Sequence, residues 1–161
     1  MYKKTVIALV GYIKKVIPTL EVFDVNFEFK DPANYASLYI LNITPTSPHE
    51  NNISQSRKDD NTKTFTYKET NYINIRIDFR GDNANENIAL FKSSFLKEEL
   101  TEFLKEAGFD FLELGTMNPI NSLRGSKSKF GMTTTLKLIS STFVIDESQI
   151  IKDIKLTVSK K

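Results

Sequence analysis

The sequence reads YINIRIDFRGDNA from Tyr72 to Ala84. Isoleucine or phenylalanine occupies the odd positions from 73 to 79, and polar residues occupy the even positions between them. Successive side chains of a strand point to opposite faces, so this pattern predicts a strand with one buried and one polar face. Gly81 then permits a sharp turn, and Asn83 followed by Glu86 is typical of a helix start with a capping box.

Two helical series follow this turn. The first consists of Ala84, Ile88, Phe91 and Phe95. The second consists of Leu96, Leu100, Phe103, Leu104 and Ala107. Gly108 then stands where a helix-terminating glycine belongs. Because Ser93 and Ser94 lie near the junction, the sequence predicts either one long helix or two abutting helices.

The residues before Tyr72 predict another helix and two strands. Apolar residues at helical spacing indicate a helix over residues 5–17 that Pro18 ends. Residues 21–29 alternate between apolar and polar side chains, which predicts a half-buried strand with Asp24 on its polar face. Residues 31–34 are typical of a turn, and the more continuous apolar run over residues 38–43 predicts a central strand.

The composition changes between Thr44 and Thr62, where the chain reads TPTSPHENNISQSRKDDNT. A stretch this long and polar is uncommon inside a compact domain unless it is functional or disordered. We therefore expect a long, projecting and mobile loop over about residues 44–62. Alternation resumes over residues 63–69, and the short link Thr70-Asn71 predicts a hairpin into the strand that follows.

Three segments are expected between Phe109 and Val144. Residues 109–114 are a short strand candidate, and residues 133–144 predict a threonine-rich strand. Residues 115–128 contain Pro119, Gly125 and several basic residues, which favours a loop.

The last part of the chain predicts a turn and one more strand. Asp146-Glu147-Ser148 is typical of a turn. Residues 150–158 then alternate, with Ile154, Leu156 and Val158 opposite Lys155 and Thr157. Residues 159–161 are expected to be a frayed tail.

These elements together predict an α+β fold. Its sheet is mixed and mostly antiparallel, flanked by the N-terminal helix and by the central one- or two-part helix. The chain has 161 residues, which suits a single domain over residues 1–161.

The composition excludes several kinds of chemistry. Cysteine is absent and His49 is the only histidine, so disulfide scaffolds, thiol catalysis and multi-histidine metal sites are ruled out. The net charge is +2, from 22 basic and 20 acidic residues, which does not indicate a nucleic-acid-binding protein. No apolar run approaches the roughly 20 residues of a membrane helix. Lys14 and Lys15 interrupt the apolar start too early for a signal peptide, so we expect the protein in the cytoplasm.

No group of residues predicts a catalytic, metal or cofactor site. His49 and Glu50 lie in the polar loop, where nothing positions them rigidly. Arg80 and Asp82 flank a helix start that could hold an anion, but an acidic residue there favours a cap with a local ion pair. The glutamates between residues 98 and 106 favour a solvated or interface face of a helix. Residues 124–129, RGSKSK, could meet DNA phosphates or an acidic protein surface.

The middle of the chain resembles the phage neck or tail terminator proteins. The likeness rests on a strand that ends in Asp78-Phe79-Arg80-Gly81, followed by Asp82-Asn83-Ala84 and a helix. A second helix then ends in Ala107-Gly108-Phe109. The likeness covers about residues 70–145, and the rest of the chain matches by the order of its elements.

This resemblance implies a non-enzymatic virion protein without cofactors. Such proteins form a ring, typically of six copies, on the head-proximal end of the tail tube, where they stop tube polymerisation and join the tail to the neck. The implied partners are further copies of the chain, the tube protein, neck or connector proteins and, in contractile tails, the sheath protein. DNA would pass through the lumen without specific binding. The expected place is the tail or neck of the virion, after assembly in the host cytoplasm.

Two polar segments are the candidate contact surfaces in such a ring. The loop over residues 44–62 is the candidate for contact with a neighbouring copy or the connector, and the basic loop is the candidate for an acidic partner or lumen DNA. The candidate interface residues are His49, Glu50, Arg57, Arg80, Asp82, Arg124, Lys127 and Lys129.

Three other functions stay open from the residues. A different head–tail adaptor or a tail-tube-like protein is the first, because such proteins share small α+β designs and ring assembly. A nucleic-acid-binding module that uses the basic loop is the second. A hydrolase with paired carboxylates on the acidic helix, Glu102 among them, is the third.

Overall fold

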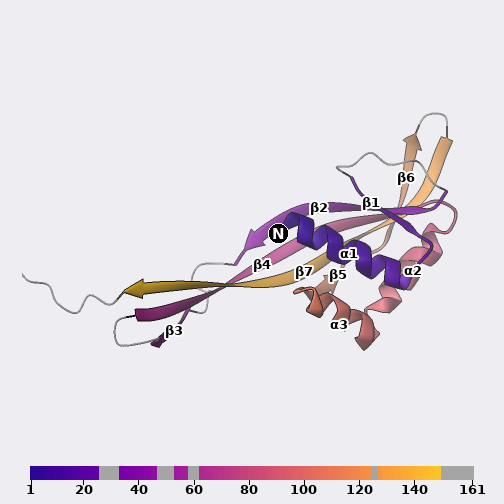
Figure 1. Cartoon of the computed structure of the whole chain (residues 1–161). Coiled ribbons are helices and arrows are strands. Elements are labelled where there is room, and N and C mark those ends of the chain that lie inside the picture. The colour runs from indigo at the N-terminus through magenta and orange to yellow at the C-terminus, as the bar shows by residue number, and fades with distance from the viewer. Residues whose placement is uncertain (26–32, 47–52, 58–61, 125–126, 150–161) are drawn as a thin grey trace, which may run out of the picture. The chain divides into compact units, whose positions relative to one another are not determined.

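The computed structural model describes residues 1–25, 33–46, 53–57, 62–124 and 127–149 (Figure 1). Its elements are α1 (Tyr2–Val16), β1 (Glu21–Asp24), β2 (Tyr35–Pro45), β3 (Ile53–Arg57), β4 (Thr62–Arg80), α2 (Ala84–Ser94), α3 (Glu98–Glu106), β5 (Asp110–Leu114), β6 (Asn118–Arg124) and β7 (Lys127–Gln149). The sheet order is β1-β2-β4-β7-β5, with β3 beside β4 and β6 beside β7. The β1–β2 pair is parallel, whereas β3–β4, β5–β7 and β6–β7 are antiparallel. The α+β class and the mixed, mostly antiparallel sheet are confirmed.

The chain divides into two compact units. The first comprises Met1–Thr44 and Asn71–Ser140, and the second comprises Pro45–Thr70 and the chain from Ser141 onward. Both β4 and β7 contribute residues to each unit. The single domain expected over residues 1–161 stays a prediction.

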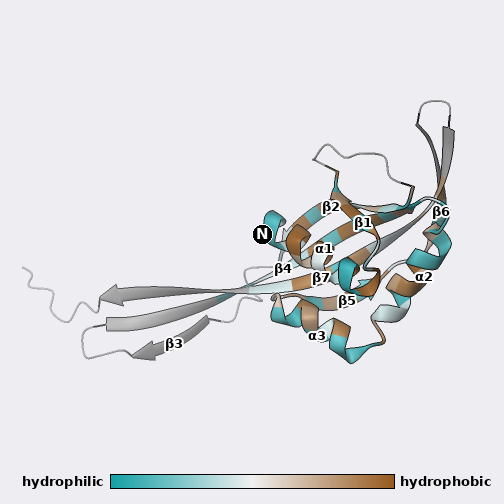
Figure 2. Ribbon diagram, turned by 45° about the vertical axis from the view of Figure 1, so that its right-hand side comes forward, coloured by the Kyte–Doolittle hydropathy of each residue, from teal (hydrophilic) through white to brown (hydrophobic). Residues whose placement is uncertain are grey.

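The core of the first unit lies between one face of the sheet and the helices. Ile73, Ile75, Ile77 and Phe79 of β4 are fully buried, and they share one cluster with residues of α1, α2 and α3. Figure 2 shows hydrophobic segments on α1 and on the strands beside it. The alternation of residues 73–79 therefore sets which face of the sheet the helices cover.

Aromatic rings and one buried hydrogen bond join α1 to α2. The ring of Tyr12 stacks on that of Phe95 at 5.2 Å between centroids, and Phe91 lies 5.5 Å from Phe79. The Tyr12 hydroxyl lies 2.7 Å from the Ser94 hydroxyl in a buried hydrogen bond. Burial raises the pKa of Tyr12, and the bond to Ser94 lowers it by less. The last residue of α2 is Ser94, so two helices form where the sequence left one or two open.

Gly81 makes the turn between β4 and α2. Its φ is 104°, a conformation that favours glycine, and an added Cβ would overlap the carbonyl oxygen of Ala33. Asn83 is the N-cap of α2, but its side chain makes no capping bond, so the predicted capping box with Glu86 is wrong. The Asn83 N–H donates instead to Oδ1 of Asn34 at 3.0 Å, because the turn packs against a distant segment.

Two predicted turns are absent from the long strands. β4 is continuous through Thr70 and Asn71, so the hairpin predicted there is wrong. The apolar positions 65, 67, 73, 75, 77 and 79 are all odd, so the alternation never changes phase at the proposed turn. β7 is likewise continuous through Asp146-Glu147-Ser148, where a turn was expected. The strand predicted over residues 150–158 and the tail at 159–161 lie outside the described residues.

Two predicted loops contain strands. Residues 53–57 of the expected loop 44–62 form β3, which pairs with residues 63–67 of β4 in antiparallel register. The expected loop 115–128 contains β6 and the start of β7, with Arg124 paired to Lys127. Pro119 opposes Met132 in this pair, and proline is tolerated because β6 pairs with β7 alone among the described strands. In each hairpin, hydrogen bonds between the strands satisfy the backbone N–H and C=O groups. A polar run of sequence does not show that its backbone will pair in this way.

Within the described residues, β1 covers the start of the strand predicted over residues 21–29. β1 ends at Asp24, the chain turns at Val25, and residues 26–32 lie outside the described residues. Asp24 was expected on the polar face but is only 6% exposed. It accepts the Tyr2 hydroxyl proton at 2.7–2.8 Å, which satisfies its carboxylate away from water.

Replacing Gly81 should strain the β4–α2 turn. Gly81→Ala places a Cβ in the positive-φ region against the Ala33 carbonyl, so we expect a loss of roughly 2 kcal/mol or more in unfolding free energy. Denaturant titration measures this loss. Gly115→Ala is the control, because its Cβ would come no closer than 3.3 Å to the Thr135 oxygen and its φ is not positive. Equal, small effects of both substitutions would contradict the account of the turn.

Removing the Tyr12 hydroxyl should weaken the contact between α1 and α2. Tyr12→Phe leaves the Ser94 hydroxyl with its bond to the Phe91 carbonyl at 2.6 Å, so the loss is that of one buried bond, about 1 kcal/mol. Thermal unfolding of Tyr12→Phe, Ser94→Ala and the double variant measures the coupling. Fully additive losses in the double variant would show that the two hydroxyls do not stabilise each other.

Candidate functional site

The face of β4 that points away from the helices carries polar side chains. Asn74, Arg76, Asp78 and Arg80 alternate with the buried residues of the core face. The Asn74 amide donates to Oδ1 of Asn42 on β2 at 2.6 Å. This open sheet face is therefore a hydrogen-bonded polar surface and not a second core.

Asp78 is the centre of a charged cluster on the open sheet face. It is only 3% exposed, and its Oδ1 accepts the Thr133 hydroxyl proton at 2.6 Å. Arg76 Nε lies 3.3 Å from Oδ1, and an Arg80 guanidinium nitrogen lies 3.6 Å from Oδ2. Two cations and one hydroxyl thus surround the buried Asp78 carboxylate and compensate for its loss of water.

Arg76 is the accessible member of the cluster. Its side chain is 44% exposed, and its guanidinium lies 4.1 Å from the centroid of the Tyr39 ring. The Arg80 side chain is only 13% exposed, and an added Cβ on Gly131 would come within 2.7 Å of its Cδ. Arg80 is thus packed against β7, whereas Arg76 offers a cation at the surface.

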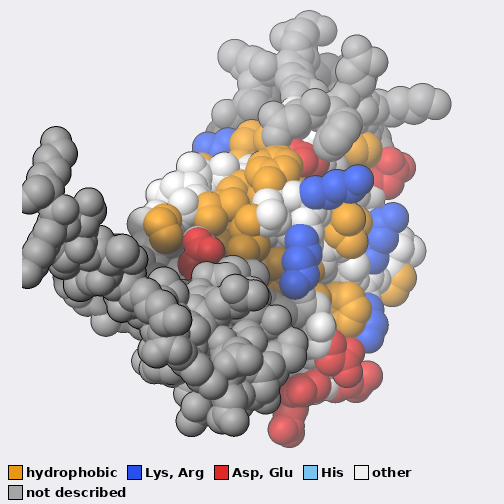
Figure 3. All heavy atoms as spheres, turned by 60° about the vertical axis from the view of Figure 1, so that its left-hand side comes forward, with side chains coloured by type: hydrophobic (Ala, Val, Ile, Leu, Met, Phe, Trp, Pro, Cys, Tyr) orange, Lys and Arg blue, Asp and Glu red, His pale blue; other side chains and the backbone are white. Residues whose placement is uncertain are grey.

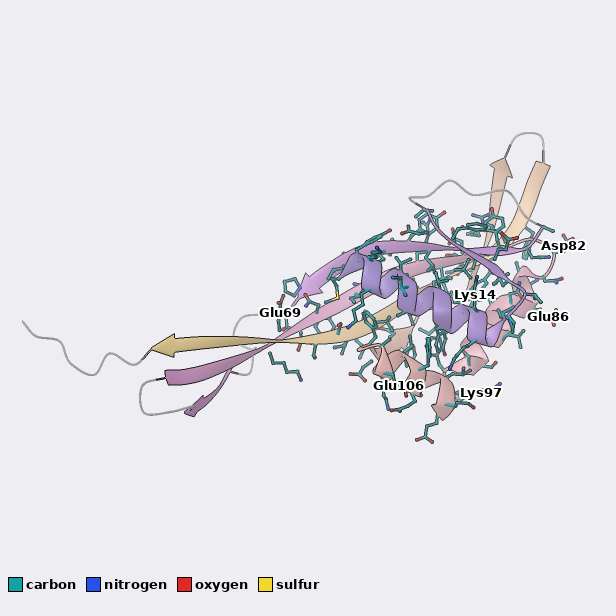
Figure 4. The ribbon with its side chains drawn as sticks, viewed as in Figure 1. Lys14, Glu69, Asp82, Glu86, Lys97 and Glu106 are labelled. Atoms are coloured by element: carbon teal, nitrogen blue, oxygen red, sulfur yellow. The ribbon has the colours of Figure 1, made fainter. Side chains whose placement is uncertain are left out.

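The predicted pair Arg80 and Asp82 separates in the structure. Arg80 forms the expected local ion pair, but with Asp78 on the open sheet face and not as an anion site at the start of α2. Asp82 is exposed in the turn after β4, and Figure 4 labels it near Glu86 at the same end of the molecule. Two carboxylates at this helix start disfavour a bound anion.

The other predicted interface residues lie on strands or outside the described chain. Arg57 is the last residue of β3, and the β6–β7 register pairs Arg124 with Lys127 and Ser122 with Lys129. The basic segment is therefore a hairpin and not the flexible loop that was expected. His49 and Glu50 lie outside the described residues.

A shallow groove lies between α1 and α3. Its volume is about 710 Å³, and Ile7, Gly11 and Phe103 line it. Ile7 is 61% exposed, and Lys3 and Lys4 border the groove. Figure 3 shows one face of the molecule on which hydrophobic side chains lie among lysines and arginines, with acidic side chains grouped at its lower edge. The acidic side of α3 is solvated, as expected, with an exposed Glu102–Lys105 pair at 3.4 Å.

A second apolar cavity lies at the β5 edge of the sheet. Its volume is about 570 Å³, and Phe95, Leu96, Phe111 and Leu112 line it. Leu96 is 89% exposed, so its place in the buried helical series was wrong. The break between α2 and α3 shifts the helical phase at this residue, and periodicity across an unrecognised break could not reveal it.

The chain offers little to a metal or a membrane in the parts that are described. No three His, Asp or Glu side chains of those parts gather as metal ligands. None of the helices there has the length and apolar character needed to cross a membrane.

Loss of the Asp78 carboxylate should destabilise the open sheet face. Asp78→Asn leaves Arg76 and Arg80 without their anion, so we expect a loss of roughly 1.5–3 kcal/mol, measured by denaturant titration. Glu113→Gln is the matched control. It removes the exposed Glu113–Lys137 pair at 2.9 Å and should cost less than about 1 kcal/mol. A larger loss for Glu113→Gln would refute this ranking.

Comparison with known proteins supplies the family. No curated protein matches the chain. One solved structure aligns over 89% of this chain and 94% of its own length, at 16% identity and a TM-score of 0.40. The family model of phage neck terminator proteins matches residues 7–158, which include residues of both compact units. This chain therefore belongs to the phage neck terminator protein family, and its role is structural, in the tail and neck of the virion.

Proposed function

We propose that copies of this chain form a ring, of six by family resemblance, on the head-proximal end of the tail tube. The ring stops polymerisation of the tube and joins the tail to the neck. The observation that carries this proposal is the family match over residues 7–158. It covers the whole first unit except its first six residues, so the proposal concerns the whole fold and not one motif.

The architecture of the first unit supports assembly. Among the described residues, the helices pack on one face of its sheet, and the open face and the β5 edge carry exposed cations and apolar side chains. Closed rings of identical chains need two different surface patches that fit each other. Separate patches at the α1–α3 groove, the open sheet face and the β5 edge meet that need.

The charged residues favour contacts over catalysis. Asp78, the buried carboxylate of the open sheet face, is only 3% exposed and is held by Arg76, Arg80 and Thr133, so it is not presented to a substrate. We infer a non-enzymatic protein without a cofactor, whose partners are its own copies, the tube protein, the neck or connector proteins and, in a contractile tail, the sheath protein. DNA passes through the lumen without specific binding, and assembly takes place in the host cytoplasm.

We infer that the basic β6–β7 hairpin is a contact surface in this ring. Three basic residues, Arg124, Lys127 and Lys129, belong to its two strands. An acidic surface of a connector protein would complement their charge. The residues Arg57, Arg124, Lys127 and Lys129 therefore stay candidate contacts, as do His49, Glu50, Arg80 and Asp82.

The direct test is the length of the tail. Without this protein, tubes should grow past their normal length, because nothing ends polymerisation; negative-stain electron microscopy of lysates measures the length. Expression of the chain from a plasmid is the control and should restore normal tails. Tails of normal length that fail to join heads would favour a head–tail adaptor instead. Normal infectious particles would overturn both functions.

DNA binding provides a second test. If the basic hairpin contacts protein, the purified chain should bind duplex DNA weakly and without sequence preference. A plot of log affinity against log salt measures the phosphates that are contacted. A steep slope of several units, abolished in Lys127→Glu with Lys129→Glu, would favour the nucleic-acid-binding module. The matched control is Lys14→Glu with Lys15→Glu on α1.

A further inference from the structure

β5 is an edge strand of the first unit. Among the described strands it pairs with β7 alone, so its outer side carries unpaired backbone groups. The register shifts between Phe111 and Glu113, and the extra residue, Leu112, is 46% exposed. Edges of this kind accept an extended segment from another chain when side-chain pockets lie beside them.

An apolar cavity lies directly beside this edge. Phe95 and Phe111 stack with ring centroids 4.3 Å apart, and both line the cavity with Leu96, Leu112 and Leu114. A single exposed leucine is ordinary on a protein surface. Leu96 and Leu112, however, border the same cavity of about 570 Å³, so their exposure forms one continuous apolar surface.

The chain itself contains a segment that fits this surface. Residues 150–158 alternate, with Ile154, Leu156 and Val158 on one side, and they lie outside the described residues. Lys152, Lys155, Lys160 and Lys161 outnumber the one acidic residue of this region, Asp153. Lys92 and Glu113 line the cavity itself, and Glu113 is already paired with Lys137 at 2.9 Å. The exposed charges next to the cavity residues in sequence are Glu98, Glu99 and Asp110, against Lys97, so the surroundings are the more acidic.

We propose that residues 150–158 of one copy lie along β5 of a neighbouring copy. Ile154, Leu156 and Val158 fill the cavity, and Lys160 and Lys161, which follow them, face the acidic residues beside it. This inference rests on the ring proposed above and specifies what joins its copies.

The donor is a neighbouring copy because the proposed ring needs a contact between copies. This exchange, in which the segment of one copy pairs with β5 of the next, is a head-to-tail contact, which is the kind that closes into a ring.

Disulfide trapping tests the contact, because the chain has no cysteine of its own. Two full-length variants, Leu112→Cys and Leu156→Cys, are mixed, allowed to assemble and oxidised, both as purified protein and in assembled tails. A disulfide-linked dimer containing one chain of each kind is the expected product. The matched control replaces Leu112→Cys with Leu41→Cys on β2, another leucine that is 54% exposed.

The outcomes separate this inference from the ring itself. Copies that assemble but link no better than the Leu41→Cys control overturn the exchange and leave the ring standing. A chain carrying both Leu112→Cys and Leu156→Cys that closes only within itself overturns the neighbour as donor. A chain that assembles neither alone nor in tails overturns both the exchange and the ring.

A charge placed on each side of the segment gives a second readout. Leu156→Glu should weaken association of the full-length chain by roughly tenfold or more, because it replaces a buried leucine with a carboxylate. Thr157→Glu makes the same charge change on the opposite side and should leave association nearly unchanged. Analytical ultracentrifugation measures both, and circular dichroism checks that both variants fold. Equal association of the two variants would overturn the proposed alternation.

Discussion

The burial of one face of β4 is the interaction on which the rest of the structure depends. Ile73, Ile75, Ile77 and Phe79 lose all contact with water because α1 and α2 cover them. Burying four such side chains contributes on the order of 1.5–3 kcal/mol each, so together they outweigh an exposed ion pair such as Glu113–Lys137. Since side chains alternate, the same burial forces Arg76, Asp78 and Arg80 to the opposite face.

This constraint connects the fold to assembly. A sheet with helices on one face keeps an open face and two edges, which an isolated protein must protect. The open sheet face stays polar because of the Asp78 cluster, in which ion pairs and a hydroxyl hydrogen bond satisfy the carboxylate. The β5 edge pairs with β7 alone among the described strands, and an apolar cavity lies beside it. Both features suit a structural component of the phage neck.

The sequence predicts the elements that local pattern determines. The helix that ends before Pro18, the strand at residues 72–79 and the glycine turn at Gly81 follow from spacing and backbone sterics alone. The strands β3 and β6 could not be predicted, because mostly polar residues form them and they lack the apolar–polar alternation that marks a half-buried strand. The sequence does indicate that β4 is continuous, because its apolar residues fall at odd positions both before and after Thr70 and Asn71.

The candidate site was harder to predict than the fold. Arg80 was singled out, but its partner Asp78 and its neighbour Thr133 are joined only by the register of β4 with β7. Leu96 was placed in the core, because its exposure depends on a break between two helices that spacing does not show. Exposed apolar residues at an edge carry no distinctive sequence signal, since the same residue types also form cores.

Cryo-electron microscopy of the head–tail junction tests the central claim most directly. We predict one ring of copies of this chain between the last tube ring and the neck. In each copy, the helices should cover one face of the sheet and leave the other face open, as in the first unit described above. Copies repeated along the whole tube would contradict a terminating role. Complete absence of the chain from the junction of mature virions would contradict the account altogether.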